Sequence, residues 1–277
     1  MYKVSTITSC FHGEKYLEGF LNHLPHQTMF DDIEIVFNHN EPSKLETSLV
    51  EEYESKYKNL NYTIEDKVIP LYTAWNKCIS KSTSEYVCVW NIDDLRTPNS
   101  IEVMAKALDE NPDVDFVYGS FLIVNNFGSD VGYLVNEMGR ESELTTGMIL
   151  GPFFMFRRSI LDKCGMFDEQ FKSGGDFDFA MRLARAGNGL CLPDILGFYL
   201  NEGTGLSTDG SELQPIERTV VERRYGLNIL EPRFEEKSLE YDIDNIFVGE
   251  TITPVGDLYM KENQNDKQKS FSFNWRK

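Results

Sequence analysis

The chain has 277 residues, of which 41% are hydrophobic and 26% charged, proportions typical of a globular protein with a substantial core. Its formal net charge of −18 excludes nucleic acid and anionic membrane surfaces as non-specific partners, because no basic excess is present to displace phosphate counterions. If the ligand is itself anionic, as a nucleotide is, the protein needs a local cation to hold it.

In chain order the apolar periodicity predicts strand 3–9, helix 14–24, strand 33–38, helix 44–57, strand 60–66, helix 70–82, strand 86–94, helix 98–110 and strand 115–124. This alternation is typical of a Rossmann-like α/β protein, with a mostly parallel central sheet flanked by helices. A hairpin turn at the GSD of residues 128–130 adds a small antiparallel element.

Beyond residue 140, glycines flank short apolar pieces, which favours loops and short strands that line a cleft. A helix is expected from about Asp176 to Gly187, with Arg182 and Arg185 on its solvated or ion-paired face, and another near residues 213–225. The polar residues 261–277 are expected to be mobile. We expect one domain over residues 1–210, followed by a C-terminal extension at 211–277.

Cysteine usage and the apolar runs indicate the compartment. The five cysteines are odd in number and form no CxxC pair, which predicts buried, reduced thiols in a cytoplasmic protein: Cys10, Cys78, Cys88, Cys164 and Cys191. The four histidines show no metal-ligand spacing with them, and His39 is expected in a solvated loop. No signal peptide and no run of about 18 apolar residues is present, so the only membrane contact left open is peripheral.

The first candidate site is the end of the apolar stretch YVCVWNIDD, where Asp93 and Asp94 follow a predicted buried strand. Open α/β sheets bind ligands at the carboxyl ends of their strands. Two adjacent carboxylates repel one another unless a cation compensates them, and carboxylate oxygens suit hard ions such as Mg2+ and Mn2+. The alternative is that Asp94 merely precedes the helix that Pro98 opens.

The second candidate site is the DFD of residues 176–178, which follows Gly174 and Gly175. The glycines would allow the backbone to approach a ligand closely, and Asp176 at the helix start is placed to act as a general base on an acceptor hydroxyl. The alternative is a simple N-cap. A metal-dependent phosphatase using the DFD is a weaker possibility, because such carboxylates usually end a buried strand.

The chain resembles family 2 glycosyltransferases of the GT-A fold over about residues 1–206, because several motifs occur in the order that this family has. These motifs are TITSCFHGEKYL, EIVFNHN, YTAWNKCI, YVCVWNIDDLRTP and the segment from GPFF to ARAG. The resemblance implies an inverting, metal-dependent transferase of the hexosyltransferase type, active in polysaccharide biosynthesis. It would use a UDP-, GDP- or dTDP-linked sugar, Mn2+ or Mg2+, and a glycan or lipid-linked acceptor.

The resemblance also assigns regions and residues. Residues 1–124 would be the nucleotide-sugar-binding half of the domain and residues 125–210 the acceptor-binding half. Thr8, Phe11, Asn38 and Asn76 would bind the nucleotide sugar, Asp93 would face the ribose, Asp94 would bind the metal, and Asp176 would be the catalytic base.

The sequence departs from the family at two places. Asn38 and Asn40 stand where many members have an aspartate that contacts the nucleoside, and no histidine follows the late FYLNEGTGLST, where Asn201 or Glu202 could substitute as a metal ligand. These departures leave an alternative open, a catalytically inactive binding or partner protein that retains the fold.

Overall fold

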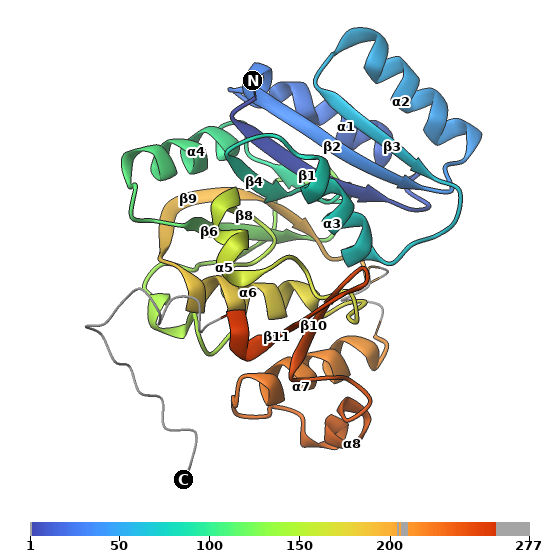
Figure 1. Cartoon of the computed structure of the whole chain (residues 1–277). Helices are drawn as coiled ribbons and strands as arrows, with labels where there is room; N and C mark the ends of the chain where they lie inside the picture. The colour runs from blue at the N-terminus through green and yellow to red at the C-terminus, as the bar shows by residue number, and fades with distance from the viewer. Residues whose placement is uncertain (1, 204, 206–209, 259–277) are drawn as a thin grey trace.

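The computed structural model describes residues 2–203, 205 and 210–258, so the predicted mobile stretch 261–277 lies outside the described residues. A nine-stranded sheet forms the centre, with its main path in the order β3-β2-β1-β4-β8-β6-β9-β5 and with β7 paired to β6 (Figure 1). Its strands are β1 Val4–Cys10, β2 Ile33–Asn40, β3 Leu60–Glu65, β4 Tyr86–Val89, β5 Leu95–Arg96, β6 Phe116–Val124, β7 Tyr133–Val135, β8 Phe154–Arg157 and β9 Gly189–Leu200.

The parallel half of the sheet places the expected site residues at one edge. Strands β1, β2, β3 and β4 are parallel, with Ser9 opposite Asn38 and Ile7 opposite Val89. Their carboxyl ends therefore meet at the same edge, as predicted for this part of the chain. The predicted strand 86–94 is shorter than expected, because β4 ends at Val89 and a turn begins before Asp93.

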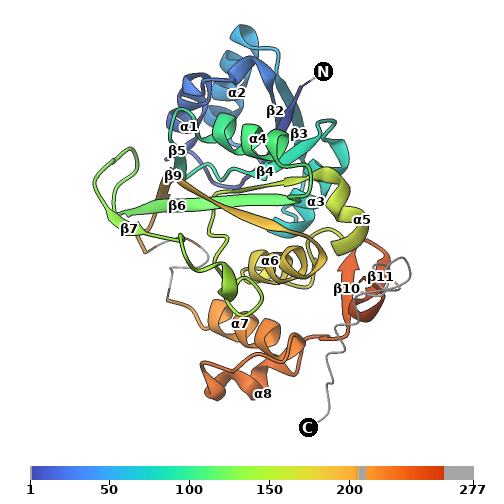
Figure 2. The same ribbon diagram turned by 90° about the vertical axis from the view of Figure 1, so that its left-hand side faces the viewer.

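Helices cover both faces of the sheet. The helices are α1 Leu17–His23, α2 Lys44–Lys56, α3 Leu71–Lys81, α4 Ser100–Glu110, α5 Leu161–Cys164, α6 Gly175–Ala186, α7 Leu213–Arg224 and α8 Glu235–Ser238. Apolar residues of α1, α2 and α4 form one core, and those of α3, α6 and α7 form the other. Helices α4 and α6 accordingly lie on opposite sides of β6 and β9 in Figure 2. Short 3-10 turns occur at Leu24–His26, Phe30–Asp32, Glu141–Glu143, Arg158–Ile160 and Pro232–Phe234.

The second half of the sheet is mixed. Strand β7 is antiparallel to β6, which confirms the predicted hairpin, and β8 is antiparallel to both β4 and β6. Strand β9, which is parallel to β6, was not predicted, because Pro193 and Gly197 interrupt its apolar pattern and its pairing with β6 is irregular.

The residues after 210 pack onto the sheet domain. Helix α7 contributes Val220 and Val221 to the core that contains Phe179 of α6. A small antiparallel pair follows, β10 Asn245–Val248 with β11 Thr251–Pro254. The C-terminal segment therefore completes one of the two hydrophobic cores.

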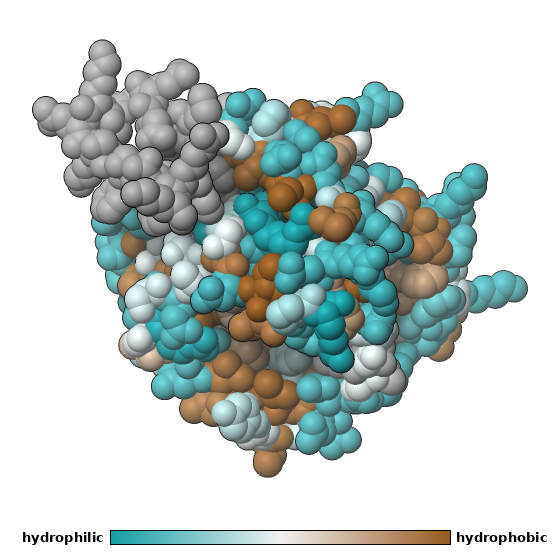
Figure 3. All heavy atoms as spheres, turned by 90° about the horizontal axis from the view of Figure 1, so that it is seen from below, coloured by the Kyte–Doolittle hydropathy of each residue, from teal (hydrophilic) through white to brown (hydrophobic). Residues whose placement is uncertain are grey.

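No helix in the described part of the chain combines the length and the apolar character needed to cross a membrane. On the face seen in Figure 3, hydrophobic residues form separate patches among hydrophilic ones.

Candidate active site

The ends of β1 and β2 place three expected nucleoside contacts differently. Phe11 follows β1 and remains 44% exposed, so its ring is available to a ligand. Asn38 is buried, and its Nδ2 donates to Glu65 Oε1 at 2.9 Å while its Oδ1 has no hydrogen-bond partner. Thr8 is also buried, and its hydroxyl donates to the Trp90 carbonyl at 2.8 Å. Phe11 is therefore accessible to a ligand, whereas Asn38 is buried without a partner for its amide oxygen and Thr8 joins β1 to the segment after β4.

Asp93 and Asp94 lie in the turn that follows β4. Asp94 is buried, and its carboxylate accepts from the Leu200 backbone N–H and from Asn91 Nδ2, both at 3.1 Å. Burial raises the pKa of Asp94 well above its usual range, and the neighbouring Asp93 adds to the shift. Burial also raises the pKa of Asp93. The two carboxylates therefore carry an electrostatic cost that a cation would relieve.

Glu202, expected as a substitute for the family's histidine, extends from the segment after β9 toward α1. Its carboxylate pairs with Lys15 and accepts from the Tyr16 hydroxyl. It also raises the pKa of Asp93, so its negative charge acts on the acidic turn.

Asp176 lies in the first turn of α6, as predicted. Its backbone N–H donates to the Tyr72 hydroxyl at 3.2 Å, and its Oδ1 accepts from the Phe177 N–H at 2.8 Å. Tyr72 is near the start of α3, which is tied to the end of β2 because the Ile69 N–H donates to Asn40 Oδ1 at 2.9 Å. Asp176 is therefore linked to the carboxyl edge of the parallel strands.

The environment of Asp176 suits proton transfer. Burial raises its pKa to about 6, and the negative charge of Glu217 acts in the same direction. A carboxylate with a pKa near the working pH can accept a proton without being too weak a base.

Glu217 of α7 supports the loop before Asp176, a role that the sequence did not indicate. Its fully buried carboxylate accepts from the backbone N–H groups of Lys172, Ser173 and Gly174. A Cβ at Gly174 would lie 2.8 Å from Glu217 Cβ, and one at Gly175 would lie 2.6 Å from the Tyr72 ring. The two glycines thus allow close approach by Glu217 and Tyr72 of the protein itself.

Asp178 turns away from Asp176 into a buried ion network. Its carboxylate contacts Arg182 at 2.8 Å and Arg224 at 2.7 Å, and Arg224 also contacts Asp168 at 2.9 Å. Burial alone would raise the pKa of Asp178, but the two arginines hold it below its usual value. The ion-paired expectation for Arg182 is confirmed, whereas the solvated one is wrong, because the side chain is fully buried.

Asn76 braces the segment before the DFD. Its Nδ2 donates to the Phe167 carbonyl at 2.8 Å and to Glu169 Oε1 at 2.9 Å, and its Oδ1 accepts from the Phe167 N–H at 3.0 Å. In this structure it therefore acts on the loop that leads to Asp176.

The expectation for His39 is wrong. The residue lies inside β2, fully buried and directly opposite Cys10 of β1. Sheet pairing therefore brings together a cysteine and a histidine that are 29 positions apart in sequence. All five cysteines are buried and free, as predicted.

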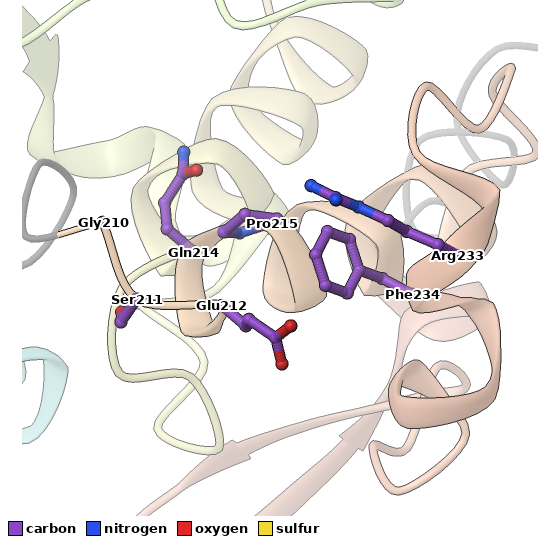
Figure 4. A pocket seen from close by; sticks show the side chains of 7 residues that line it. All are labelled: Gly210, Ser211, Glu212, Gln214, Pro215, Arg233 and Phe234. Carbon is purple, nitrogen blue, oxygen red and sulfur yellow. The ribbon is translucent and has the colours of Figure 1, made fainter.

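A cavity of about 300 Å3 lies at the start of α7, lined by Glu212, Gln214, Pro215, Arg233, Phe234 and their neighbours (Figure 4). Arg233 lies over the Phe234 ring, with its guanidinium carbon 4.6 Å from the ring centre. None of the lining residues is an expected site residue, so the cavity is separate from the acidic turn and from Asp176.

Comparisons with known proteins agree with the fold and with the resemblance. A family model described as Glycosyl transferase family 2 matches residues 5–165. An uncharacterized glycosyltransferase of Methanocaldococcus jannaschii is 22% identical over 174 residues, which make up 61% of this chain and 60% of that protein. The present chain thus spans about three fifths of this curated relative.

Two solved structures share the architecture. S. aureus TarS 1-349 in complex with UDP-GlcNAc has a TM-score of 0.64 and 21% identity, covering 80% of this chain and 65% of that one. The mannosyltransferase PcManGT from Pyrobaculum calidifontis, in complex with GDP-Man and Mn2+, has a TM-score of 0.57 and 16% identity, covering 87% of this chain and 66% of that one. At these identities the likeness confirms the predicted GT-A fold.

Proposed function

The chain belongs to glycosyl transferase family 2, and we propose that it is an inverting glycosyltransferase that moves a sugar from a nucleotide-sugar donor to a hydroxyl of a glycan or lipid-linked acceptor. The observation that carries this proposal is the combination of two adjacent, partly or fully buried carboxylates, Asp93 and Asp94, with a third, Asp176, whose pKa is raised to about 6 by its burial. A protein with only a scaffolding role has no need for this arrangement of costly charges.

We assign binding of the nucleotide-sugar donor to residues at the carboxyl ends of β1 and β2. Phe11 presents an exposed ring, whereas the unpartnered amide oxygen of Asn38 is buried, so this side chain would have to turn before it could accept from a nucleobase N–H. Thr8 and Asn76 hold the surrounding backbone through the hydrogen bonds described above. Similar structures contain UDP-GlcNAc in TarS and GDP-Man in PcManGT, which supports a nucleotide diphosphate sugar as the donor class.

The donor set at Asp94 fits a hard divalent cation, Mn2+ or Mg2+. Asp94 would hold the ion and Asp93 would face the ribose, and the ion would lower the cost of burying both carboxylates. When bound, the cation supplies charge stabilisation to the departing nucleoside diphosphate. Glu202 is the nearby acidic group that could complete the ligand set.

Asp176 provides the base. With a pKa of about 6 it is ionised near neutral pH and can take the proton of the acceptor hydroxyl while that oxygen attacks the anomeric carbon. Attack from the face opposite the leaving diphosphate forms the new carbon–oxygen bond as the bond to phosphate breaks, which inverts the configuration.

Thermal shift with UDP, GDP, dTDP and CDP, each with Mn2+, Mg2+ or EDTA, tests the proposal without knowledge of the acceptor. A ligand that binds only the folded state raises its stability with the logarithm of ligand concentration over Kd. We expect one nucleotide to stabilise the wild type in a metal-dependent manner and to lose this effect in Asp94→Asn. The control is Asp130→Asn, an exposed aspartate of the hairpin, which should behave as wild type.

Two results separate the transferase from the inactive alternative. Sugar release or transfer from the stabilising donor, absent in Asp176→Asn although the nucleotide still binds, supports catalysis. Nucleotide binding with no turnover by the wild type on any acceptor or water would favour a binding protein that retains the fold. No binding by any nucleotide at millimolar concentration would overturn the donor assignment.

A further inference from the structure

A second group of potential metal ligands lies at the carboxyl ends of β1 and β2. It consists of Cys10 at the end of β1, His39 in β2 and Glu46 in the first turn of α2, all at most 1% exposed. Within the described residues, this group brings together three ligating atoms of His, Cys, Asp or Glu residues within 4.8 Å of one another. None of the three was an expected site residue.

Two of the three separations between the ligating atoms match those of a tetrahedral metal site. Glu46 Oε1 lies 3.5 Å from Cys10 Sγ and 3.4 Å from His39 Nε2. Metal bonds of about 2.3 Å to sulfur and about 2.0 Å to nitrogen or oxygen, at tetrahedral angles, place ligand atoms roughly 3.3–3.5 Å apart.

His39 gives a second indication of a bound ion, independent of these distances. Its Nε2 is buried and makes no hydrogen bond, although Glu46 Oε1 lies 3.4 Å away. A buried polar atom without a partner is costly, and a metal ion in the middle of the group would satisfy it. The other ring nitrogen, Nδ1, lies 2.9 Å from the Tyr62 hydroxyl, so a neighbouring group can fix the tautomer that leaves Nε2 free to bind.

The remaining ligands are also held in place by neighbouring groups. Glu46 Oε1 accepts from the Gly13 N–H at 2.7 Å and Oε2 from the Ser43 N–H at 2.8 Å, which fixes the carboxylate plane. The two non-glycine residues with left-handed backbone in the described part of the chain, His12 and Glu41, lie in the loops beside this group. Strained loop residues that surround buried ligating atoms are common at binding sites.

The charges balance if a divalent ion binds. A cysteine binds a metal ion as the thiolate and a histidine as the neutral imidazole. Binding of a divalent ion displaces the thiol proton to solvent, and the thiolate and the Glu46 carboxylate then neutralise the two positive charges.

We propose that Cys10, His39 and Glu46 form a buried binding site for a borderline-soft divalent cation of the zinc type, separate from the hard-cation site at Asp94. The sulfur and imidazole ligands favour such ions over Mg2+. Cys10 precedes Phe11 and His39 follows Asn38, so the ion would brace the two strand ends that carry the expected nucleoside contacts. The site does not depend on the proposed transferase activity.

Cobalt(II) titration of the full chain after EDTA dialysis tests the site. The wild type should bind one equivalent of Co2+ with a thiolate-to-cobalt charge-transfer band and the intense visible bands of tetrahedral cobalt, both of which Zn2+ should remove. Cys10→Ser should lose the charge-transfer band, whereas Cys88→Ser, at another buried free cysteine, should retain it. Asp94→Asn should also retain it, which distinguishes this site from the one proposed for the diphosphate.

The outcomes are decisive in both directions. Absence of the charge-transfer band in the wild type at millimolar Co2+ overturns the proposal and leaves the three residues as a metal-free hydrogen-bonded group. A band that survives Cys10→Ser has the same consequence. If Cys10→Ser fails to fold, His39→Gln in the same titration decides, since loss or a marked shift of the visible bands is expected.

Discussion

Glu217 Oε2 lies 2.6 Å from the backbone nitrogen of Gly174, two residues before Asp176. The same carboxylate accepts from Ser173 at 2.7 Å and from the Tyr241 hydroxyl at 3.0 Å. A side chain of the C-terminal segment thus fixes the backbone that presents the proposed base. Both partners of this contact lie beyond residues 5–165, the part of the chain that matches the family model.

Removing this carboxylate should destabilise the protein strongly. Glu217→Ala leaves the N–H groups of Ser173 and Gly174 without an acceptor in a buried place, and each such group costs about 1–3 kcal/mol. We expect a loss of roughly 3 kcal/mol or more in urea denaturation. Glu236→Ala, at an exposed glutamate of α8, should change stability by less than about 0.5 kcal/mol. Equal stabilities of the two variants would contradict the supporting role.

Neutralising Glu217 should lower the pKa of Asp176. Glu217→Gln keeps an oxygen that can accept from Ser173 and Gly174 but removes the negative charge that acts on Asp176. Tyr72 and the Phe177 N–H, the other groups that face Asp176, are unchanged. The carboxyl titration of Asp176 by NMR should therefore move below about 6, and the acid limb of the pH–rate profile should move with it. An unchanged titration would show that the two carboxylates are not coupled.

Asp176→Asn should stabilise the protein near neutral pH while it strongly lowers turnover. The pKa of Asp176 is about 6 in the folded state, against about 3.9 when unfolded, so the folded state binds more protons between these values and loses stability as pH rises through them. Because part of the side chain is exposed, we expect a gain of about 1–2 kcal/mol, or roughly 2–6 °C in Tm.

Differential scanning calorimetry near pH 8 and near pH 4 tests whether Asp176→Asn raises the Tm in the expected pH range. The gain should be present at the higher pH and largely absent at the lower one, where the wild-type carboxyl is protonated in the folded state. Asp113→Asn, at an exposed aspartate, is the control and should show no such pH-dependent gain. A Tm for Asp176→Asn at or below that of wild type near pH 8 would contradict the assignment. Turnover should fall about 10²–10⁴-fold, the usual contribution of a general base.

The sequence pattern predicted the parallel half of the sheet well, because each strand there is a short apolar run bounded by a helix with clear periodicity. Strand β9 escaped prediction, since Pro193 and Gly197 lie within it and its partner β6 is about 70 residues earlier. The local propensity of a segment gives no information about pairing with such a distant strand.

Candidate site residues could be named from the sequence where a single motif contains them, as with Asp93 and Asp94 or with Asp176, and their roles stay predictions. It was not predictable where sheet pairing or helix packing joins distant residues. His39 was expected in solvent and is buried opposite Cys10, and Glu217 lies in a polar helix whose sequence gives no sign of a carboxylate that accepts from a loop more than 40 residues earlier.

Arg224 should hold the C-terminal segment to the sheet domain. Its fully buried guanidinium contacts Asp168 and Asp178 and donates to the carbonyls of Asp242 and Asn245. Arg224→Met leaves two buried carboxylates with fewer partners, and breaking such a pair costs about 3–5 kcal/mol. Arg233→Met, at an ion pair whose arginine is 74% exposed, should cost less than about 1 kcal/mol. Urea denaturation of both variants measures the two losses in the free energy of unfolding.

The same network predicts that the chain cut after residue 210 does not fold cooperatively. Such a fragment lacks Val220, Val221 and Arg224, which belong to the core and ion network shared with α6. We expect broad thermal unfolding and weak dispersion of the amide NMR signals. A fragment that unfolds in one sharp transition at the wild-type Tm would show instead that residues 211–277 form an independent extension.

Gly175→Ala tests the close contact between the start of α6 and Tyr72. The added methyl group would lie 2.6 Å from the Tyr72 ring, so the ring or the helix must shift. Helix propensity alone favours alanine by up to about 1 kcal/mol, whereas overpacking costs about 1–3 kcal/mol, so we expect net destabilisation. Gly256→Ala, also at a helical position, has no atom within 4 Å of the new Cβ and should not destabilise the protein. Because Tyr72 also binds the Asp176 N–H, Gly175→Ala should reduce kcat more than it raises the KM for the donor. A variant as stable and as active as wild type would show that this contact does not position the base.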